Sequence, residues 1–441
     1  MLIPVNRKTV QNIKNPAFTA YAGIYLDIFD DFKNQVEKAG VEMEDAQDPR
    51  AQMLTREYLA ASGATVRNDG KSIYLNRISP ACVACRTGVG TATFFLSLQC
   101  SRNCFYCFNP NQEQYDYYTA NTRDCIQELD AISERDQRLD CIALTGGEPL
   151  LHAEQAIAFI QSARKRFPEA HIRLYTAGDL TNDETLCALR DAGLDEIRYS
   201  IRLHERLEDQ NHTLHQIAQA MEYIPSVMVE MPVLPGTLER MKEILLELER
   251  IGISSINLLE FCFPFNNART FHEKGYRIKN PPYRVLYNYW YAGGLPIAGS
   301  EEECLQLLEF ALKQNLTIGI HYCSLENKHT GQVYQQDFHA PTPALAEFSG
   351  KDFFFKTVKV FGDDISGVLD RLHDGGVHDH HLDTDLSYLE FHVRDIPLLD
   401  GLAVELAICT SVMEPREDGE YLRELRVDLT YPDQFDSEKD L

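Results

Sequence analysis

The sequence predicts an α/β fold in which parallel strands alternate with helices. Short β-branched or aliphatic runs recur along the middle of the chain, and amphipathic segments of helical length separate them. The predicted strands are 91–98, 141–145, 172–176, 196–201, 227–233 and 255–260, and the predicted helices lie near 121–136, 152–166, 181–192, 211–222 and 237–251. Because right-handed crossovers join such units, six of them predict a full or partial α/β barrel whose site lies at the carboxyl ends of the strands.

The segments on either side of this alternation have different patterns. Residues 1–75 are polar and helical in pattern, which predicts an N-terminal helical extension. Residues 76–340 hold the alternating units, and after Glu260 they become loop-like and rich in aromatic residues. The Pro341-Thr342-Pro343 run predicts a linker, and the antiparallel strand patterns of 341–441 predict a small α+β domain.

Composition and charge exclude several classes of protein. With 44% hydrophobic and 25% charged residues, the chain has the composition of a globular protein. No apolar run reaches the roughly 18–20 residues of a membrane helix, and the N-terminal residues lack the apolar core of a secretory signal, so we expect a cytoplasmic protein. The 42 basic and 67 acidic residues give a net charge of −25, which argues against a nucleic-acid or membrane partner.

Cysteines are numerous for a cytoplasmic protein, and five of the twelve lie between positions 82 and 107. Since disulfides rarely persist in the cytoplasm, such clustering indicates metal binding or redox chemistry. Cys100, Cys104 and Cys107 form a C-x3-C-x2-C loop directly after the first predicted strand. Three thiolates at this spacing suit three corners of a small Fe–S cluster, whereas a structural zinc ion takes four protein ligands.

This loop, with Tyr106 before its third cysteine, resembles the signature of radical S-adenosylmethionine (SAM) enzymes. The run Thr145-Gly146-Gly147-Glu148-Pro149, at the end of the second predicted strand, resembles the GGEP motif of the same superfamily. The resemblance covers residues 91–261 and implies a partial (β/α)6 radical SAM barrel. Through Ser79–Gly88 and His321–Ser324, among other segments, it extends to a branch related to pyruvate formate-lyase activating enzymes.

The resemblance implies where the cofactors would bind. Cys100, Cys104 and Cys107 would ligate three irons of a [4Fe–4S] cluster, and the amine and carboxylate of SAM would chelate the fourth. By analogy, the SAM-binding residues would be Gly146, Gly147 and Glu148 at the amino group, Tyr106 near the adenine, Ser200 at the ribose, Arg202 at the carboxylate and Glu230 on the adenine side. The alternative for Arg202 is a surface cation.

The resemblance also implies an activity. One electron from the reduced cluster would cleave SAM to methionine and a 5′-deoxyadenosyl radical, which would abstract hydrogen from an unidentified small-molecule or peptide substrate. The electron donor would be a protein such as flavodoxin or ferredoxin. Two alternatives stay open, namely a glycyl-radical-enzyme activase acting on a protein partner and a noncatalytic Fe–S or metal-binding protein of the same fold.

Cysteines outside the loop offer a candidate auxiliary metal site. Cys82 and Cys85 have the spacing of half a metal knuckle, and Cys323 beside His321 is the best candidate for the other half, with Cys262 or Cys304 next. A second Fe–S cluster and a structural zinc ion would both fit, and a pair of free thiols is the alternative. We expect this pair at the amino end of the first strand, on the opposite side of the barrel from SAM.

Two further groups of residues could bind ligands, but each also fits a structural role. His373, His378, His380 and His381, with aspartates nearby, resemble a metal site but are more typical of a solvated turn. The tyrosines of 287–291 could stack on a planar substrate, although packing of a lid against the barrel mouth is favoured.

Overall fold

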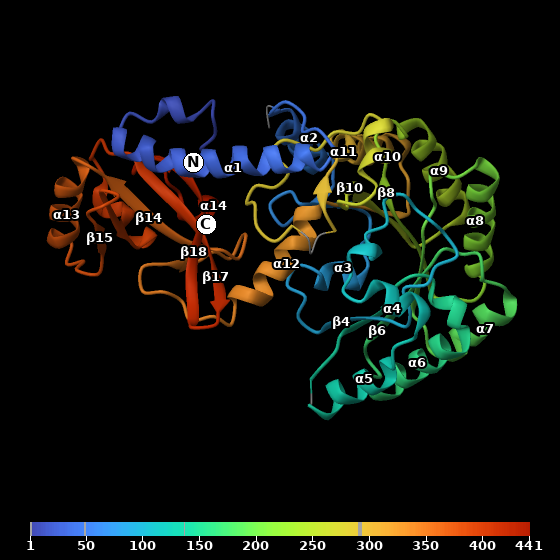
Figure 1. Ribbon diagram of the computed structural model, residues 1–441. Coiled ribbons are helices and arrows are strands. Elements are labelled where there is room, and N and C mark those ends of the chain that lie inside the picture. The colour runs from blue at the N-terminus through green and yellow to red at the C-terminus, as the bar shows by residue number, and fades with distance from the viewer. Residues whose placement is uncertain (1, 48–49, 136, 290–292) are drawn as a thin grey trace. The chain divides into compact units, whose positions relative to one another are not determined.

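The computed structural model describes residues 2–47, 50–135, 137–289 and 293–441, which form two compact units. The larger unit comprises 39–282 and 289–329, and the smaller comprises 1–38, 283–288 and 330–441. Figure 1 colours the chain by residue number through both units. Of the tyrosines in 287–291 that could stack on a substrate or pack as a lid, Tyr291 lies outside the described residues.

The larger unit is built on a nine-stranded sheet in the order β2-β3-β12-β9-β8-β7-β6-β5-β4. Its parallel strands are β4 (Thr91–Phe95), β5 (Cys141–Thr145), β6 (His171–Thr176), β7 (Glu196–Tyr199), β8 (Ser226–Val233), β9 (Ser255–Glu260) and β12 (Gly319–Cys323). Neighbours from β4 to β9, and β9 with β12, all pair in parallel. The predicted α/β architecture of alternating strands and helices is confirmed.

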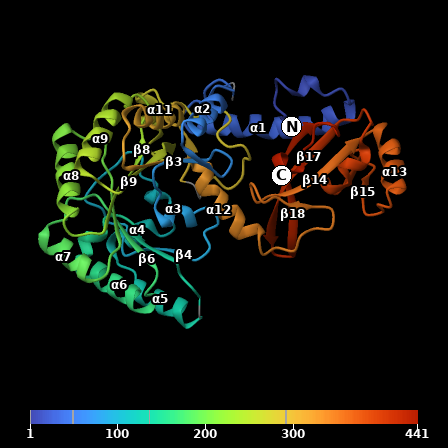
Figure 2. The same ribbon diagram turned by 180° about the vertical axis from the view of Figure 1, so that it is seen from behind.

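Helices join the successive parallel strands and cover one face of the sheet (Figure 2). They are α5 (Cys125–Glu134), α6 (Ala153–Arg166), α7 (Asp183–Asp191), α8 (Leu207–Ala220) and α9 (Leu238–Ile251), with α11 (Ser300–Gln314) before β12 and α2 (Arg50–Ala61) before the edge hairpin. Their buried apolar residues and those of the strands form one hydrophobic core, in which Phe159 of α6 and Leu174 of β6 take part.

Each parallel strand divides its residues between two faces. On β6, Ile172 and Leu174 are fully buried in the core against the helices, and Arg173 and Tyr175 alternate with them. The sheet therefore has one apolar face under the helices and a second face that carries polar side chains. We call the second face the inner face, and its polar residues include Arg173, Tyr175, Glu196, Arg198, Glu230, Asn257 and His321.

Residues 65–75, expected within a helical extension, form a hairpin instead. β2 (Thr65–Arg67) pairs antiparallel with β3 (Ser72–Leu75), and β3 pairs antiparallel with β12. Asn68 and Asp69 take positive φ values in the turn, a conformation that Asn and Asp tolerate well. The partner of β3 is β12, which lies far along the chain, so the local pattern of the N-terminal segment did not predict the hairpin.

The smaller unit contains an antiparallel sheet in the order β1-β18-β17-β14-β16-β15, with β13 paired to β14. Its strands are β1 (Ile3–Pro4), β13 (Glu347–Phe348), β14 (Phe355–Phe361), β15 (His381–Asp383), β16 (Tyr388–Phe391), β17 (Leu406–Arg416) and β18 (Gly419–Thr430). Two helices pack with it, α1 (Pro16–Lys38) and α13 (Asp364–Asp374). Phe18 of α1 stacks on Phe361 of β14, with ring centroids 4.9 Å apart.

Candidate active site

The three cysteines predicted to bind a cluster follow β4 on one loop. Cys100 is exposed, and Cys104 and Cys107 are half-buried. Burial raises the pKa of each thiol, that of Cys104 to about 11, and the neighbouring cysteines add to the rise at Cys104 and Cys107. Because the thiols affect one another's ionisation, the three predicted ligands lie close together.

The donor set of this loop fits a cluster with an open iron. Among the described residues, no three His, Cys, Asp or Glu side chains are arranged around one point as a single metal ion would require. A single zinc ion holds its sulfur ligands at about 2.3 Å, whereas the irons of a cluster bind their thiolates at separate corners. Three free thiols on one loop are the donor set that a [4Fe–4S] cluster with one open iron would take.

The glycine-rich turn after β5 packs against the backbone that leads into the cysteine loop. The Gly147 amide donates to the Ser97 carbonyl at 3.0 Å, and the Glu148 amide donates to the Gln99 carbonyl at 2.7 Å. A Cβ atom at Gly147 would lie 1.9 Å from the Gln99 oxygen, and one at Gly146 would lie 2.5 Å from the Ser97 oxygen. Only glycine fits at these two positions, so the two predicted motifs meet at the carboxyl ends of β4 and β5.

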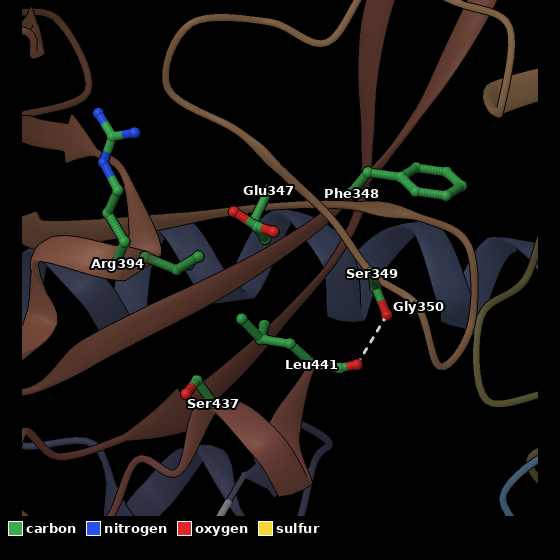
Figure 3. Close-up of a pocket in the computed structure, with 8 residues that line it drawn as sticks. Glu347, Phe348, Ser349, Gly350, Arg394, Ser437 and Leu441 are labelled. Carbon is green, nitrogen blue, oxygen red and sulfur yellow. Dashed lines mark hydrogen bonds between the residues drawn. The ribbon is translucent and has the colours of Figure 1, made fainter.

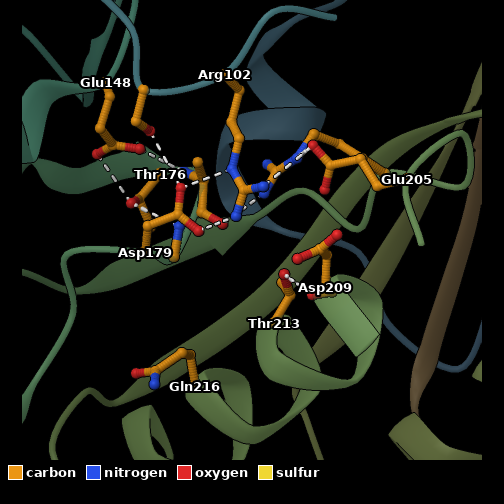
Figure 4. A network of polar contacts seen from close by, with 12 residues as sticks. Arg102, Glu148, Thr176, Asp179, Glu205, Asp209, Thr213 and Gln216 are labelled. Carbon is orange, nitrogen blue, oxygen red and sulfur yellow. Dashed lines mark hydrogen bonds and ion pairs between the residues drawn. The ribbon is translucent and has the colours of Figure 1, made fainter. Parts of the chain in front are cut away.

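Glu148 is buried, and protein groups bind both of its carboxylate oxygens (Figure 4). Oε1 accepts hydrogen bonds from Thr176 Oγ1 at 2.9 Å and from the Leu150 amide at 3.1 Å, and Oε2 accepts one from the Ala177 amide at 2.5 Å. Burial raises the pKa of Glu148, and these hydrogen bonds oppose the rise. A carboxylate offers about four lone-pair sites, so one remains for a ligand ammonium. The same hydrogen bonds link the turn after β5 to the end of β6.

Arg202 is buried, so the alternative of a surface cation is wrong. Its Nε donates to Glu205 Oε1 at 3.0 Å, and its Nη2 donates to the Ala177 carbonyl at 3.1 Å. Its positive charge counteracts the rise in pKa that burial causes at Cys100 and Cys104. Arg202 therefore lies beside the cysteine loop, and a guanidinium with five N–H donors retains capacity for a carboxylate ligand.

Arg102, inside the cysteine loop, was not singled out by the sequence analysis. Its guanidinium binds both carboxylate oxygens of Asp179, with Nε donating at 2.7 Å, and Nη1 donates to Glu205 at 3.3 Å (Figure 4). Ser101 Oγ also donates to Asp179, at 3.1 Å. Glu205 is thus shared between Arg102 and Arg202, and the cysteine loop is fastened to the segments that follow β6 and β7. Acidic residues directly after predicted strands were the signal that could have found this network.

Comparisons with known proteins agree with this geometry. Residues 95–248 match the family model of the radical SAM superfamily. A Methanocaldococcus jannaschii protein named as a glycyl-radical enzyme activating enzyme is 28% identical over 261 residues, which cover 56% of this chain and 64% of that protein. Residues 95–248 of this chain therefore form a radical SAM domain.

Solved structures are similar to parts of this chain. Streptococcus suis SuiB, bound to its precursor peptide SuiA, is 10% identical with a TM-score of 0.39, over 55% of this chain and 51% of that one. TsrM of Kitasatospora setae, a radical SAM methyltransferase bound to tryptophan, is 15% identical with a TM-score of 0.31, over 44% and 40%. The matches thus span less than two thirds of each of these proteins. In the described part of the radical SAM protein, every helix is too short or too polar to cross a membrane.

The remaining residues predicted to bind SAM lie in two places. Tyr106 packs among aromatic rings, with centroid distances of 5.1 Å to His204 and 5.5 Å to Phe261. Ser200 is half-buried, and its carbonyl accepts a hydrogen bond from Arg202 Nη1 at 3.2 Å.

Glu230, by contrast, is engaged on the inner face. Its Oε2 accepts hydrogen bonds from Arg198 Nη1 at 2.5 Å and from Asn257 Nδ2 at 2.7 Å. Its expected place on the adenine side of SAM stays a prediction.

The predicted auxiliary cysteines also gather on the inner face. Cys82 lies on α3 (Pro80–Ala84), and its Sγ accepts hydrogen bonds from Asn257 Nδ2 at 3.2 Å and Arg198 Nη2 at 3.6 Å. Burial raises the pKa of Cys323 to about 12, and the thiols of Cys85 and Cys82 add to that rise. A group bound here would therefore lie among inner-face residues.

Cys304 is not available to such a site, because it is fully buried in the apolar core against the helices.

In the smaller unit, the rings of His378 and His380 lie 5.5 and 5.7 Å from that of His373, but within the described residues no three such groups suit a metal ion. A pocket of about 440 Å³ lies between Glu347, Arg394 and Leu441 of the same unit (Figure 3). All the residues predicted to bind SAM lie in the larger unit.

Proposed function

We propose that this radical SAM enzyme reductively cleaves SAM at a [4Fe–4S] cluster and uses the resulting 5′-deoxyadenosyl radical to abstract hydrogen from a small-molecule or peptide substrate. Cys100, Cys104 and Cys107 would hold three irons and leave one iron for SAM. The observation that carries the proposal is the junction of the cysteine loop with the Gly146-Gly147-Glu148 turn at adjacent strand ends. In this proposal the parallel sheet is a partial (β/α)6 barrel, and this junction lies at its catalytic end.

The chain's own residues would bind and orient SAM around this junction. Glu148 would accept a hydrogen bond from the SAM ammonium, and Arg202 would pair with its carboxylate. Gly146 and Gly147 leave room for close approach of the ligand to the backbone. Ser200 would meet the ribose, and the backbone of Tyr106 would lie by the adenine.

Product formation after anaerobic reconstitution tests the proposal. The protein is reduced in the presence of SAM, and 5′-deoxyadenosine and methionine are measured by chromatography. We expect Cys104→Ala to abolish both products and the electron paramagnetic resonance signal of the reduced cluster. Cys187→Ala is the matched control, because Cys187 is a half-buried thiol on α7 that belongs to neither cysteine group. Cleavage at the wild-type rate in Cys104→Ala would refute the proposal.

A second candidate function, the activation of a protein partner, is favoured by the name of the Methanocaldococcus relative. A donor such as flavodoxin or ferredoxin would supply the electron in either case. The two functions differ in what stimulates SAM cleavage. An activase would respond to the macromolecular fraction of a cell extract, and an enzyme acting on a small molecule would respond to the filtrate.

For Cys82, Cys85 and Cys323 we propose an auxiliary Fe–S site, with free thiols as the alternative. A structural zinc ion would use the same thiolates and is the second alternative, so zinc is measured beside iron in the test that follows. The test is iron and zinc analysis of a variant in which Cys100, Cys104 and Cys107 are all alanine. Residual iron that is lost on further changing Cys82 and Cys85 would support the site, residual zinc lost in the same way would favour a zinc ion, and a metal-free, folded triple variant would favour free thiols.

A further inference from the structure

A continuous row of hydrogen-bonded polar side chains crosses the inner face from β7 to β3. Arg198 Nη1 binds Glu230 Oε2 at 2.5 Å, and the same oxygen accepts from Asn257 Nδ2 at 2.7 Å. Asn257 Oδ1 contacts His321 Nδ1 at 3.0 Å, and His321 Nε2 contacts Ser72 Oγ at 2.8 Å. The strand register aligns Glu230 with Asn257 and Asn257 with His321, so the row follows from the parallel pairing.

The charges around this row do not balance. While the neighbouring cysteines are free thiols, the cations that act on Glu230 are Arg173, Arg198 and Lys328 and the anions are Glu196 and Glu230, so 3 − 2 leaves one positive charge in excess. Arg198 takes up both carboxylates, with Nε donating to Glu196 at 2.6 Å and Nη1 donating to Glu230. A surplus charge away from water is costly unless a counter-ion pairs with it.

Two of these cations keep free hydrogen-bonding capacity. Nη1 of Arg173 is buried without a hydrogen-bond partner, although Nε contacts the Tyr175 hydroxyl at 3.3 Å. Lys328, on α12 (Leu325–Asp337), is half-buried and has no ion pair with any described residue. Arg173 pairs with Glu196 in the register of β6 and β7, and α12 begins two residues after β12. Both cations also act on Glu230, so both lie near the row.

The inner face also leads to the proposed SAM site. Arg198 and Arg202 are four residues apart on β7 and the segment that follows it. Ile197, Tyr199 and Ile201 are buried in the core against the helices, which leaves Arg198, Ser200 and Arg202 on the other face. Four extended residues span roughly 13 Å. A ligand held at Arg173 and Lys328 would therefore extend toward the position where hydrogen abstraction is proposed.

We propose that Arg173 and Lys328 bind an oxyanion of the substrate, which would make the substrate an anionic small molecule carrying a carboxylate or a phosphate. The hydrogen-bonded row from Arg198 to Ser72 forms the wall of this binding site. The assignment of the ligand as substrate rests on the proposed function, whereas the binding site itself does not. The guanidinium of Arg173 can bind either a carboxylate or a phosphate through paired hydrogen bonds, so the experiment distinguishes these two oxyanions.

Thermal unfolding in the presence of two probes tests the proposal. Wild-type protein is titrated with sodium malonate or with sodium phosphate, and sodium chloride at equal ionic strength is the reference. We expect one oxyanion to raise the melting temperature saturably, and the more effective probe identifies the class of ligand. Arg173→Met and Lys328→Met should each need at least about tenfold more of that probe, because each loses a charge-assisted hydrogen bond. Arg190→Met is the matched control, since Arg190 is an exposed arginine on α7.

Several outcomes would overturn the proposal. Equal shifts of the melting temperature with chloride, malonate and phosphate would overturn it. Wild-type shifts in both Arg173→Met and Lys328→Met would overturn it as well. If Arg173→Met does not fold, Arg173→Lys is used instead, because lysine keeps the charge but lacks the guanidinium. Wild-type responses in both Arg173→Lys and Lys328→Met would then count against the site. Loss of the response in Cys82→Ser/Cys85→Ser would assign the cations to a thiolate-bound group and would also refute it.

The two proposals fail separately. Malonate or phosphate binding requires neither cluster nor SAM, so its absence in a protein that cleaves SAM refutes the oxyanion site alone. Binding in a protein that fails to cleave SAM refutes the proposed function alone.

Discussion

Replacing Glu148 by glutamine separates its structural role from its proposed role in binding SAM. The carboxylate accepts hydrogen bonds from Thr176, Leu150 and Ala177, which a glutamine cannot all reproduce because one oxygen becomes an NH2 donor. If the amide nitrogen faces Ala177, that buried N–H loses its acceptor, at a cost of about 1–3 kcal/mol in the free energy of unfolding. Loss of a charge-assisted hydrogen bond to the SAM ammonium would cost about 1.5–3 kcal/mol more, in binding only.

Two measurements distinguish these costs. Urea unfolding gives the loss of stability, and calorimetry gives SAM affinity, which should fall by about one to two decades in Glu148→Gln. Thr176→Val is the control, because it removes one hydrogen bond to Glu148 without changing the charge. If SAM affinity falls no further in Glu148→Gln than in Thr176→Val, Glu148 has only a structural role and our assignment is wrong.

Three further changes give measurable outcomes. Gly147→Ala places a Cβ against the Gln99 oxygen and should lower both iron content and SAM affinity, and wild-type values would contradict the packing described. Asp179→Asn removes a charge that binds Arg102 and should reduce iron retention on buffer exchange, with wild-type retention as the contrary result. Burial raises the pKa of Asp337 to about 7, so the folded protein binds a proton that the unfolded chain releases near pH 4. Stability should therefore fall between pH 4 and pH 7 by up to about 4 kcal/mol, and Asp337→Asn should melt higher than wild type at pH 8 but not at pH 4.

The strands of the larger unit were predictable because their residues alternate locally. β5 to β9 each carry aliphatic residues bounded by polar turns, and such runs need no knowledge of their partners. The hairpin of β2 and β3 was not predictable in this way, since β3 is stabilised by pairing with β12. Short strands at the edge of a sheet depend on distant partners more than on their own sequence.

In the candidate site, too, the contiguous motifs were predictable and the contacts between distant residues were not. The cysteine loop and the glycine turn are contiguous motifs, and the structure brings them together through hydrogen bonds to Ser97 and Gln99. The partners of Arg102 are Asp179 and Glu205, which follow different strands. Their meeting depends on the strand order of the sheet, which the sequence pattern does not specify.

The polar inner face could have been predicted from the strand sequences, because two of them are not continuous aliphatic runs. Parallel strands covered on both faces by apolar groups read as continuous aliphatic runs. β6 and β7 instead place Arg173 and Arg198 between fully buried aliphatic or aromatic residues, which predicts that one face of the sheet meets polar groups. Buried polar groups persist when hydrogen bonds satisfy them, and Arg198 is satisfied by Glu196 and Glu230. Arg173 Nη1, beside this row, has no such partner, and an unsatisfied buried donor beside a surplus cation is where an anionic ligand would bind most strongly.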